Sequence, residues 1–268
     1  MVSTAVGPVA ADPALLEASD CSKHYRGLVA LADYSVSIPA RSIHGIIGPN
    51  GAGKTTLFNL LSGMVRPSSG SVRLQGVEIT RLPPHEVARL GISRTFQNIR
   101  LFDDMSVIDN VKVAVQRHWS GSLASSLISS RSFRRREDEI EARSAELLEL
   151  VGLSDRASRP AGSLPYGGQR RLEIARATAT EPKVLLLDEP SAGMNQSETA
   201  DLLALIRRLR DQFGITIVLV AHDIPLVMNL CDRIQVLNYG ILIADGDPAA
   251  VRIDPEVIAA YLGQAKHA

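Results

Sequence analysis

Short apolar runs alternate with amphipathic segments along most of this chain. Strand-length segments rich in apolar residues occupy residues 43–47, 184–187 and 215–220. Segments with helical spacing of apolar residues lie between them, at residues 57–61, 172–180 and 199–210. Buried strands that alternate with helices are typical of a parallel sheet covered on both faces. The pattern therefore predicts an α/β fold.

The N-terminal part of the chain has a different pattern. Residues 31–38 partly alternate between apolar and polar side chains, as a half-buried antiparallel strand does. We expect β structure over residues 18–38 and again over 71–76. Residues 1–15 lack a basic start followed by an apolar segment, so we expect a disordered tail and no signal peptide there.

Residues 98–165 differ from the α/β pattern on either side. Apolar residues recur at helical spacing over 107–115, and residues 137–151 form a strongly amphipathic run. A serine-rich, basic stretch at 120–136 separates them. We interpret this part as a helical subdomain inserted into one domain of residues 16–250, with a short C-terminal helix and tail at 251–268.

Composition excludes several classes of protein. The 268 residues carry a formal net charge of zero, so no overall basic field favours nucleic acid as a partner. No apolar run approaches the roughly 18–20 residues that a membrane span needs. Cys21 and Cys231 are too few for a disulfide framework or a zinc site, and we expect reduced thiols in a cytosolic protein.

A glycine-rich segment of the form G-x-x-x-x-G-K-T follows the first apolar strand and precedes a helix. In that context it predicts a phosphate-binding loop, because backbone N–H groups and a helix N-terminus then surround a phosphate. Lys54 adds a mobile positive charge, and the Thr55 hydroxyl is a ligand for Mg²⁺. The candidate nucleotide-binding residues of the loop are Gly48, Pro49, Asn50, Gly51, Ala52, Gly53, Lys54, Thr55 and Thr56.

Polar side chains also follow three other predicted strands. Gln97 follows a strand expected at residues 91–96, Asp188 and Glu189 follow the strand at 184–187, and His222 follows the strand at 215–220. Ligands gather at the carboxyl ends of parallel strands, so we expect these residues to lie beside the phosphate loop. Each residue alone is a weak signal. Together they suggest a carboxylate for Mg²⁺ at Asp188 and a proton acceptor at Glu189.

The segment Leu164–Ala177 resembles the signature of ABC transporter ATPases, which reads LSGGQ and continues into a helix containing IARA. The order of motifs also matches that family, over roughly residues 19–246. The resemblance implies a P-loop ABC ATPase core with a mixed sheet, an antiparallel β subdomain and an inserted helical subdomain. It also implies a site for ATP and Mg²⁺, with hydrolysis of ATP.

The resemblance also assigns roles to single residues. Tyr25 is similar to the aromatic residue that stacks on adenine, and Gln97 to a glutamine that links Mg²⁺ to the membrane partner. Glu189 resembles the catalytic glutamate and His222 the switch histidine, which with Gln97 and Lys54 complete the catalytic set. The implied metal ligands are Thr55, Gln97 and Asp188.

In this family two cassettes close head to tail, so a signature acts on the ATP of the neighbouring chain. The signature positions here are Pro165, Tyr166, Gly167 and Gly168. Proline replaces the usual serine and offers neither a hydroxyl nor an N–H. Two further departures are Asn195 in the D-loop and Ala221 before the switch histidine.

Finer features, including Arg94-Thr95-Phe96-Gln97 and the C-terminal Ala260-Tyr261-Leu262-Gly263, resemble ATP-binding subunits of bacterial branched-chain amino-acid importers. The resemblance implies as partners two permease subunits, a second cassette of the same or a paralogous chain, and indirectly a solute-binding protein. The expected location is the cytoplasmic face of the cell membrane, without nucleic acid as partner. Urea or amide importers are alternatives, as is a regulatory subunit with weak hydrolysis. An ABC ATPase of DNA repair or ribosomes would need coiled coils, zinc cysteines or a second cassette.

Overall fold

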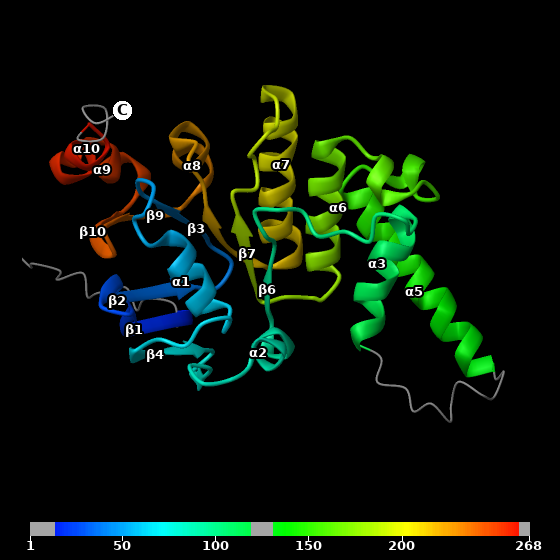
Figure 1. Cartoon of the computed structure of the whole chain (residues 1–268). Coiled ribbons are helices and arrows are strands. Elements are labelled where there is room, and N and C mark those ends of the chain that lie inside the picture. Colours follow the sequence, from blue (N-terminus) through cyan, green and yellow to red (C-terminus); the bar gives the residue numbers. More distant parts are fainter. Residues whose placement is uncertain (1–13, 119–130, 263–268) are drawn as a thin grey trace, which may run out of the picture.

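A computed structural model describes residues 14–118 and 131–262 (Figure 1). Most of the expected N-terminal tail, part of the serine-rich stretch and the last six residues lie outside the described residues. The first strand begins at Ala14, two residues before the start that we expected for the main domain.

The larger sheet holds six strands in the order β10-β9-β3-β8-β7-β6. All neighbours are parallel except β10, which pairs antiparallel with β9 at one edge. The bounds are β3 Ile43–Ile47, β6 Ile92–Arg94, β7 Val184–Asp188, β8 Thr216–Val220, β9 Arg233–Asn238 and β10 Ile241–Gly246. Strands β3, β7 and β8 are buried throughout, as their apolar sequences predict. Their carboxyl ends form one edge, which receives the polar residues discussed below.

The smaller sheet is antiparallel, with the order β2-β1-β4-β5. Its strands are β1 Ala14–Tyr25, β2 Leu28–Pro39, β4 Ser69–Leu74 and β5 Val77–Glu78. Helix α1 (Lys54–Leu61) packs between the two sheets, because Leu57, Phe58 and Leu61 share one hydrophobic core with strands of both. The N-terminus of α1 is thereby fixed against both layers.

A group of helices stands at the opposite end of the molecule from the C-terminus (Figure 1). It contains α3 (Val107–Val115), α5 (Arg131–Leu150) and α6 (Tyr166–Thr178), which contact one another. The other helices within the described ranges are α2 Pro84–Leu90, α7 Gln196–Phe213, α8 Ile224–Leu230, α9 Pro248–Ile253 and α10 Pro255–Leu262, with short 3-10 turns at Gln116–His118, Ser154–Arg156 and Ala161–Ser163. The predicted fold class, a mixed sheet with an antiparallel sheet and a helical subdomain, is confirmed. Within the described ranges, no helix has both the length and the apolar character of a membrane span.

Two helices begin earlier than their sequence patterns indicate. Helix α6 starts at Tyr166, six residues before the predicted start at residue 172. The sequence pattern missed its first turn because two glycines there are poor helix formers. Helix α7 starts at Gln196, where Asn195 and Glu198 form a capping box: the Asn195 side chain accepts from the Glu198 N–H, and the Glu198 side chain accepts from the Asn195 N–H.

Candidate functional site

The loop between β3 and α1 has the geometry of a phosphate cradle. Gly53 has a φ of 102° and is the N-cap of α1. A Cβ at Gly48 would lie 2.1 Å from the Leu237 carbonyl oxygen, and a Cβ at Gly53 would lie 2.6 Å from the Ala30 carbonyl oxygen. Glycine is therefore required at both positions by close backbone contacts. The first N–H groups of α1 are left for an anion.

Lys54 is the first residue of α1, and its side chain folds back onto this loop. Its Nζ donates to the carbonyl oxygens of Gly48 at 2.6 Å and Pro49 at 2.8 Å. Burial lowers the pKa of Lys54, and the negative charges of Glu189 and Asp188 act in the opposite direction. The ammonium group is thus placed beside the N-terminus of α1, with the same anion in reach of both.

A cavity of about 650 Å³ opens over the loop, a size that suits a nucleotide. Residues 50–56 line it, together with Tyr25, Gln97, Glu189 and His222. The structure therefore brings together residues that the sequence separates by almost 200 positions. Gly48, Pro49 and Asp188 are close to these residues in the sequence but are not part of the cavity lining.

Glu189 is held between the other two polar residues of the cavity. His222 Nε2 lies 2.8 Å from Glu189 Oε1, and Gln97 Nε2 donates to Glu189 Oε2 at 3.4 Å. The Glu189 backbone is in the left-handed region, with a φ of 47°, and its N–H donates to the Val220 carbonyl at 2.8 Å. Such a backbone is uncommon for a residue other than glycine. It turns the carboxylate off the end of β7 toward the cavity.

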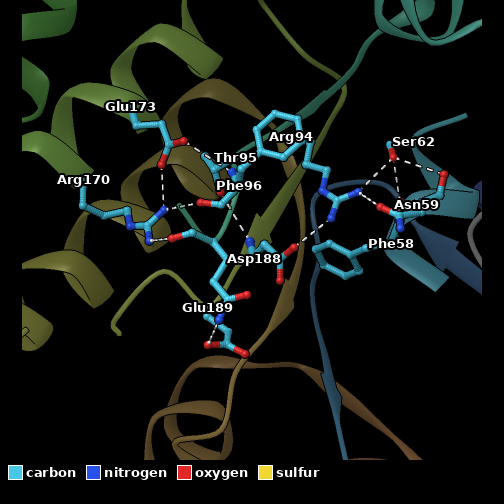
Figure 2. Close-up of polar contacts among 11 residues, drawn as sticks. Phe58, Asn59, Ser62, Arg94, Thr95, Phe96, Arg170, Glu173, Asp188 and Glu189 are labelled. Atoms are coloured by element: carbon cyan, nitrogen blue, oxygen red, sulfur yellow. Dashed lines mark hydrogen bonds and ion pairs between the residues drawn. The ribbon is translucent and has the colours of Figure 1, made fainter. Parts of the chain in front are cut away.

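Asp188 has a partner that the sequence did not indicate (Figure 2). Arg94 donates through Nη2 to Asp188 Oδ2 at 2.8 Å, and both side chains are nearly buried. Arg94 also donates through Nη1 to Asn59 Oδ1 at 2.7 Å and to the Ser62 hydroxyl at 3.2 Å. Asn59 lies on α1, and Ser62 is its C-cap. One arginine therefore ties the carboxylate of β7 to the helix that follows the phosphate loop.

A second arginine holds the backbone that carries Gln97 (Figure 2). Arg170 is fully buried and donates to the carbonyl oxygens of Phe96 at 2.7 Å and Gln97 at 2.9 Å. It also pairs with Glu173 at 2.7 Å, and Glu173 accepts from the Phe96 N–H at 3.3 Å. The sequence showed Arg170 and Glu173 only as charged residues in a helix. The structure makes them the link between α6 and the Gln97 segment.

The signature positions lie away from the cavity, at the N-terminus of α6. Pro165 is the N-cap and gives no side-chain capping bond. Tyr166 is 43% exposed, and its ring lies 3.2 Å from the position of a Cβ at Gly193. A Cβ at Gly167 would lie 2.6 Å from Glu198 Oε1. Within one chain these residues do not meet the phosphate loop.

Sequence comparisons match most of the chain. The family model for the ABC transporter matches residues 31–192, and that for the branched-chain amino acid ATP-binding cassette transporter matches 242–267. The high-affinity branched-chain amino acid transport ATP-binding protein BraF of Pseudomonas aeruginosa is 47% identical over 94% of this chain and 98% of its own length. LivG of Escherichia coli, which has the same description, is 45% identical over the same shares.

Solved structures show the same likeness. The ADP conformation of an ATP-binding cassette of an ABC transporter superposes with a TM-score of 0.81 at 31% identity, covering 93% of this chain and 99% of that one. A nucleotide-free ATP-binding cassette from an ABC transporter superposes with a TM-score of 0.79 at 30% identity, covering 92% and 98%. Both the fold and the order of the motifs are therefore shared over nearly the whole length.

Proposed function

This chain belongs to the ABC transporter family and is an ATP-hydrolysing cassette of it, and from that premise we propose that it powers an importer of branched-chain amino acids. The observation that carries the proposal is the cavity in which Glu189, His222 and Gln97 face the phosphate loop. The solute class is supported by the two relatives that cover almost the full chain and by the match at the C-terminus.

Nucleotide binding uses the wall of the cavity. The N–H groups of the phosphate loop and Lys54 bind the phosphates, and Tyr25, 43% exposed at the cavity, stacks on the base. The Lys23 ammonium lies 5.1 Å from the centre of the Tyr25 ring, a contact that favours one orientation of the ring. Burial of Lys54 strengthens its attraction for a phosphate, since fewer water molecules compete for it.

Hydrolysis uses Glu189 as the general base. The carboxylate accepts a proton from water, the water oxygen bonds to the γ-phosphorus, and the bond to the bridging oxygen breaks to give ADP and phosphate. His222 contacts one carboxylate oxygen of Glu189, and Gln97 donates to the other. Both are therefore positioning residues for the carboxylate, and their placement in the cavity lets them contact the γ-phosphate.

The donor set beside Lys54 fits Mg²⁺, a cation that prefers oxygen ligands and uses few protein groups. The Thr55 hydroxyl lines the cavity. Gln97 points its amide nitrogen at Glu189, which leaves the amide oxygen for the cation. Asp188 gives Oδ2 to Arg94 and keeps Oδ1. When bound, the cation stabilises charge that develops on the transferred phosphoryl group.

Partners follow from the incomplete site. The signature residues Pro165–Gly168 lie outside the cavity of their own chain, so we propose that they complete the site of a second cassette, a copy or a paralogue. Two permease chains and a solute-binding protein complete the importer, and the cassette binds the cytoplasmic face of the membrane. Nucleic acid has no place in this assembly.

The experiment that tests hydrolysis is Glu189→Gln in the complex copurified with its permeases. We expect ATP turnover to fall by at least about 100-fold, the usual contribution of a general base, with ATP binding retained. Glu78→Gln, an exposed carboxylate on β5, is the matched control and should keep wild-type turnover. Unchanged turnover in Glu189→Gln would contradict the assignment.

The solute is tested separately, by uptake into vesicles that contain the complete transporter. We expect ATP-dependent uptake of leucine, isoleucine or valine. Uptake of urea or short amides instead would keep the ATPase role and overturn the proposed solute.

A further inference from the structure

Tyr239 is an aromatic residue that lines the cavity but belongs to none of the motifs described above. It lines the same cavity as Tyr25 and the phosphate loop, and it is 77% exposed. It stands with Gly240 in the two-residue connection between β9 and β10, where Asn238 pairs with Ile241. A large exposed ring at the edge of a ligand cavity requires a physical reason.

The backbone at Tyr239 is unfavourable for tyrosine. Its φ is 48° and that of Gly240 is 81°, the pattern of a type I′ hairpin turn, in which Asn-Gly or Asp-Gly is strongly preferred. Aromatic residues rarely adopt a positive φ. Because the side chain is mostly exposed, packing within this chain does not offset the strain. Strained residues of this kind gather at functional sites.

The turn is also fixed to the cavity by its backbone. The Gly240 N–H donates to the Ala52 carbonyl of the phosphate loop at 2.9 Å, and the Ala32 N–H of β2 donates to the Gly240 carbonyl at 2.8 Å. These bonds join the turn to the loop that holds the phosphates and to the strand that follows Tyr25. The backbone of the turn that carries Tyr239 is therefore held beside the phosphate loop.

We propose that Tyr239 contacts the nucleoside part of the bound nucleotide and forms, with Tyr25, a second aromatic wall of the site. This inference rests on the proposed nucleotide site. The ring has a flat apolar face that is exposed at the cavity, and base–aromatic stacking is a strong, sequence-tolerant contact. The nucleotide thus supplies the packing that the described residues do not give the Tyr239 ring.

The test substitutes the residue that the turn prefers, Tyr239→Asn, in the purified full-length chain. Titration calorimetry measures binding of ADP and of inorganic pyrophosphate, and thermal unfolding measures Tm. We expect ADP affinity to fall about tenfold, which corresponds to roughly 1.4 kcal/mol, with pyrophosphate affinity unchanged. We expect Tm to rise by about 2 °C, because strain in the turn is relieved. A purely structural tyrosine would not give lower affinity together with higher stability.

Two further variants keep the result interpretable. Gln75 and Gly76 connect β4 and β5 with φ angles of 51° and 76°, so Gln75→Asn introduces the same residue at the equivalent position of a turn with similar φ angles, away from the cavity. It should leave ADP affinity unaltered. Tyr239→Phe keeps the ring and should keep ADP affinity.

Three outcomes would overturn the inference. If Tyr239→Asn binds ADP as tightly as the wild type, Tyr239 makes no contact with the nucleoside. ADP binding by the wild-type chain would still support the proposed nucleotide site. Equal losses for ADP and pyrophosphate would assign Tyr239 to the shape of the phosphate loop. Weaker assembly with a second cassette at unchanged ADP affinity would assign the ring to a protein contact.

Discussion

Helices α1 and α6 both begin with glycine-rich segments that present N–H groups, yet their surroundings differ. The N-terminus of α1 is enclosed: Gly48 and Gly53 touch backbone oxygens of other strands, and the Lys54 side chain is buried within the loop. The N-terminus of α6 is open, since Tyr166 and the flanking Pro165 are exposed. In the proposed assembly, the first binds the phosphates of its own chain's nucleotide, and the second meets the nucleotide of another chain.

The same short segment anchors both helices. Arg94 at the end of β6 binds α1 through Asn59, whereas Arg170 of α6 binds the carbonyl oxygens of Phe96 and Gln97 (Figure 2). Gln97 lies three positions after Arg94 in the sequence. If a ligand at its N-terminus displaces α6, the hydrogen bonds of Arg170 transmit the movement to the segment that carries Gln97. The comparison predicts that substitutions around the N-terminus of α1, the enclosed side, destabilise the fold. Substitutions at the N-terminus of α6, the open side, should change mainly function.

The largest expected effect is that of Arg94→Met. It leaves the Asp188 carboxylate buried without its cation, and breaking a buried ion pair in this way costs about 3–5 kcal/mol. The free energy of unfolding is measured by urea denaturation. Arg156→Met is the control, because Arg156 lies 3.6 Å from Asp155 at the surface, and an exposed pair contributes about 0–1 kcal/mol.

A double variant separates the lost charge from lost packing. Arg94→Met with Asp188→Asn leaves no unpaired charge, so it should be more stable than Arg94→Met alone. If the loss of stability in the double variant equals the sum of the losses in Arg94→Met and Asp188→Asn alone, the ion pair does not stabilise the contact between β7 and α1.

Gly48→Ala has the next largest effect. Its Cβ would lie 2.1 Å from the Leu237 carbonyl oxygen, a backbone atom that cannot rotate away. Overpacking of this kind costs about 3 kcal/mol, and displacement of the loop should abolish ADP binding in calorimetry. Gly51→Ala is the control: a Cβ there meets nothing within 4 Å, although the φ is 78°. Its cost should be smaller, at about 1 kcal/mol.

Gly167→Ala is the matched change on the open side. The added Cβ meets Glu198 Oε1 at 2.6 Å, the end of a flexible side chain. Displacing Glu198 weakens the cap of α7 by about 1 kcal/mol, whereas alanine within a helix gains roughly 0.5–1 kcal/mol over glycine. The free energy of unfolding should therefore stay close to wild type. ATP turnover of the assembled complex should still fall several-fold, because the methyl group lies beside the proposed contact with the partner's ATP. A large loss of stability would remove the difference between the two helix ends.

Sequence alone predicted the fold class, most strands and the gathering of Gln97, Glu189 and His222 at one edge. Those predictions rest on local patterns and on a general property of parallel sheets. It did not predict the Arg94–Asp188 pair, whose members are 94 positions apart, or the place of Tyr239 in the cavity. Both depend on how the elements pack in three dimensions, which no short pattern records.

Pro165→Ser should have the smallest effect, and it acts in the opposite direction. A serine at the N-cap of α6 restores a hydroxyl where the family has one. One additional hydrogen bond contributes about 0.5–1.5 kcal/mol, and up to about 3 kcal/mol when the acceptor is charged, so turnover of the assembled complex should rise at least about threefold. A serine N-cap also favours the helix, so stability should not fall, and Pro165→Ala is the control without a hydroxyl. Equal turnover in both variants and the wild type would show that the N–H groups of α6 suffice. A rise of about 1,000-fold exceeds a single hydrogen bond, even one to a charged group, and would favour a regulatory subunit with weak hydrolysis.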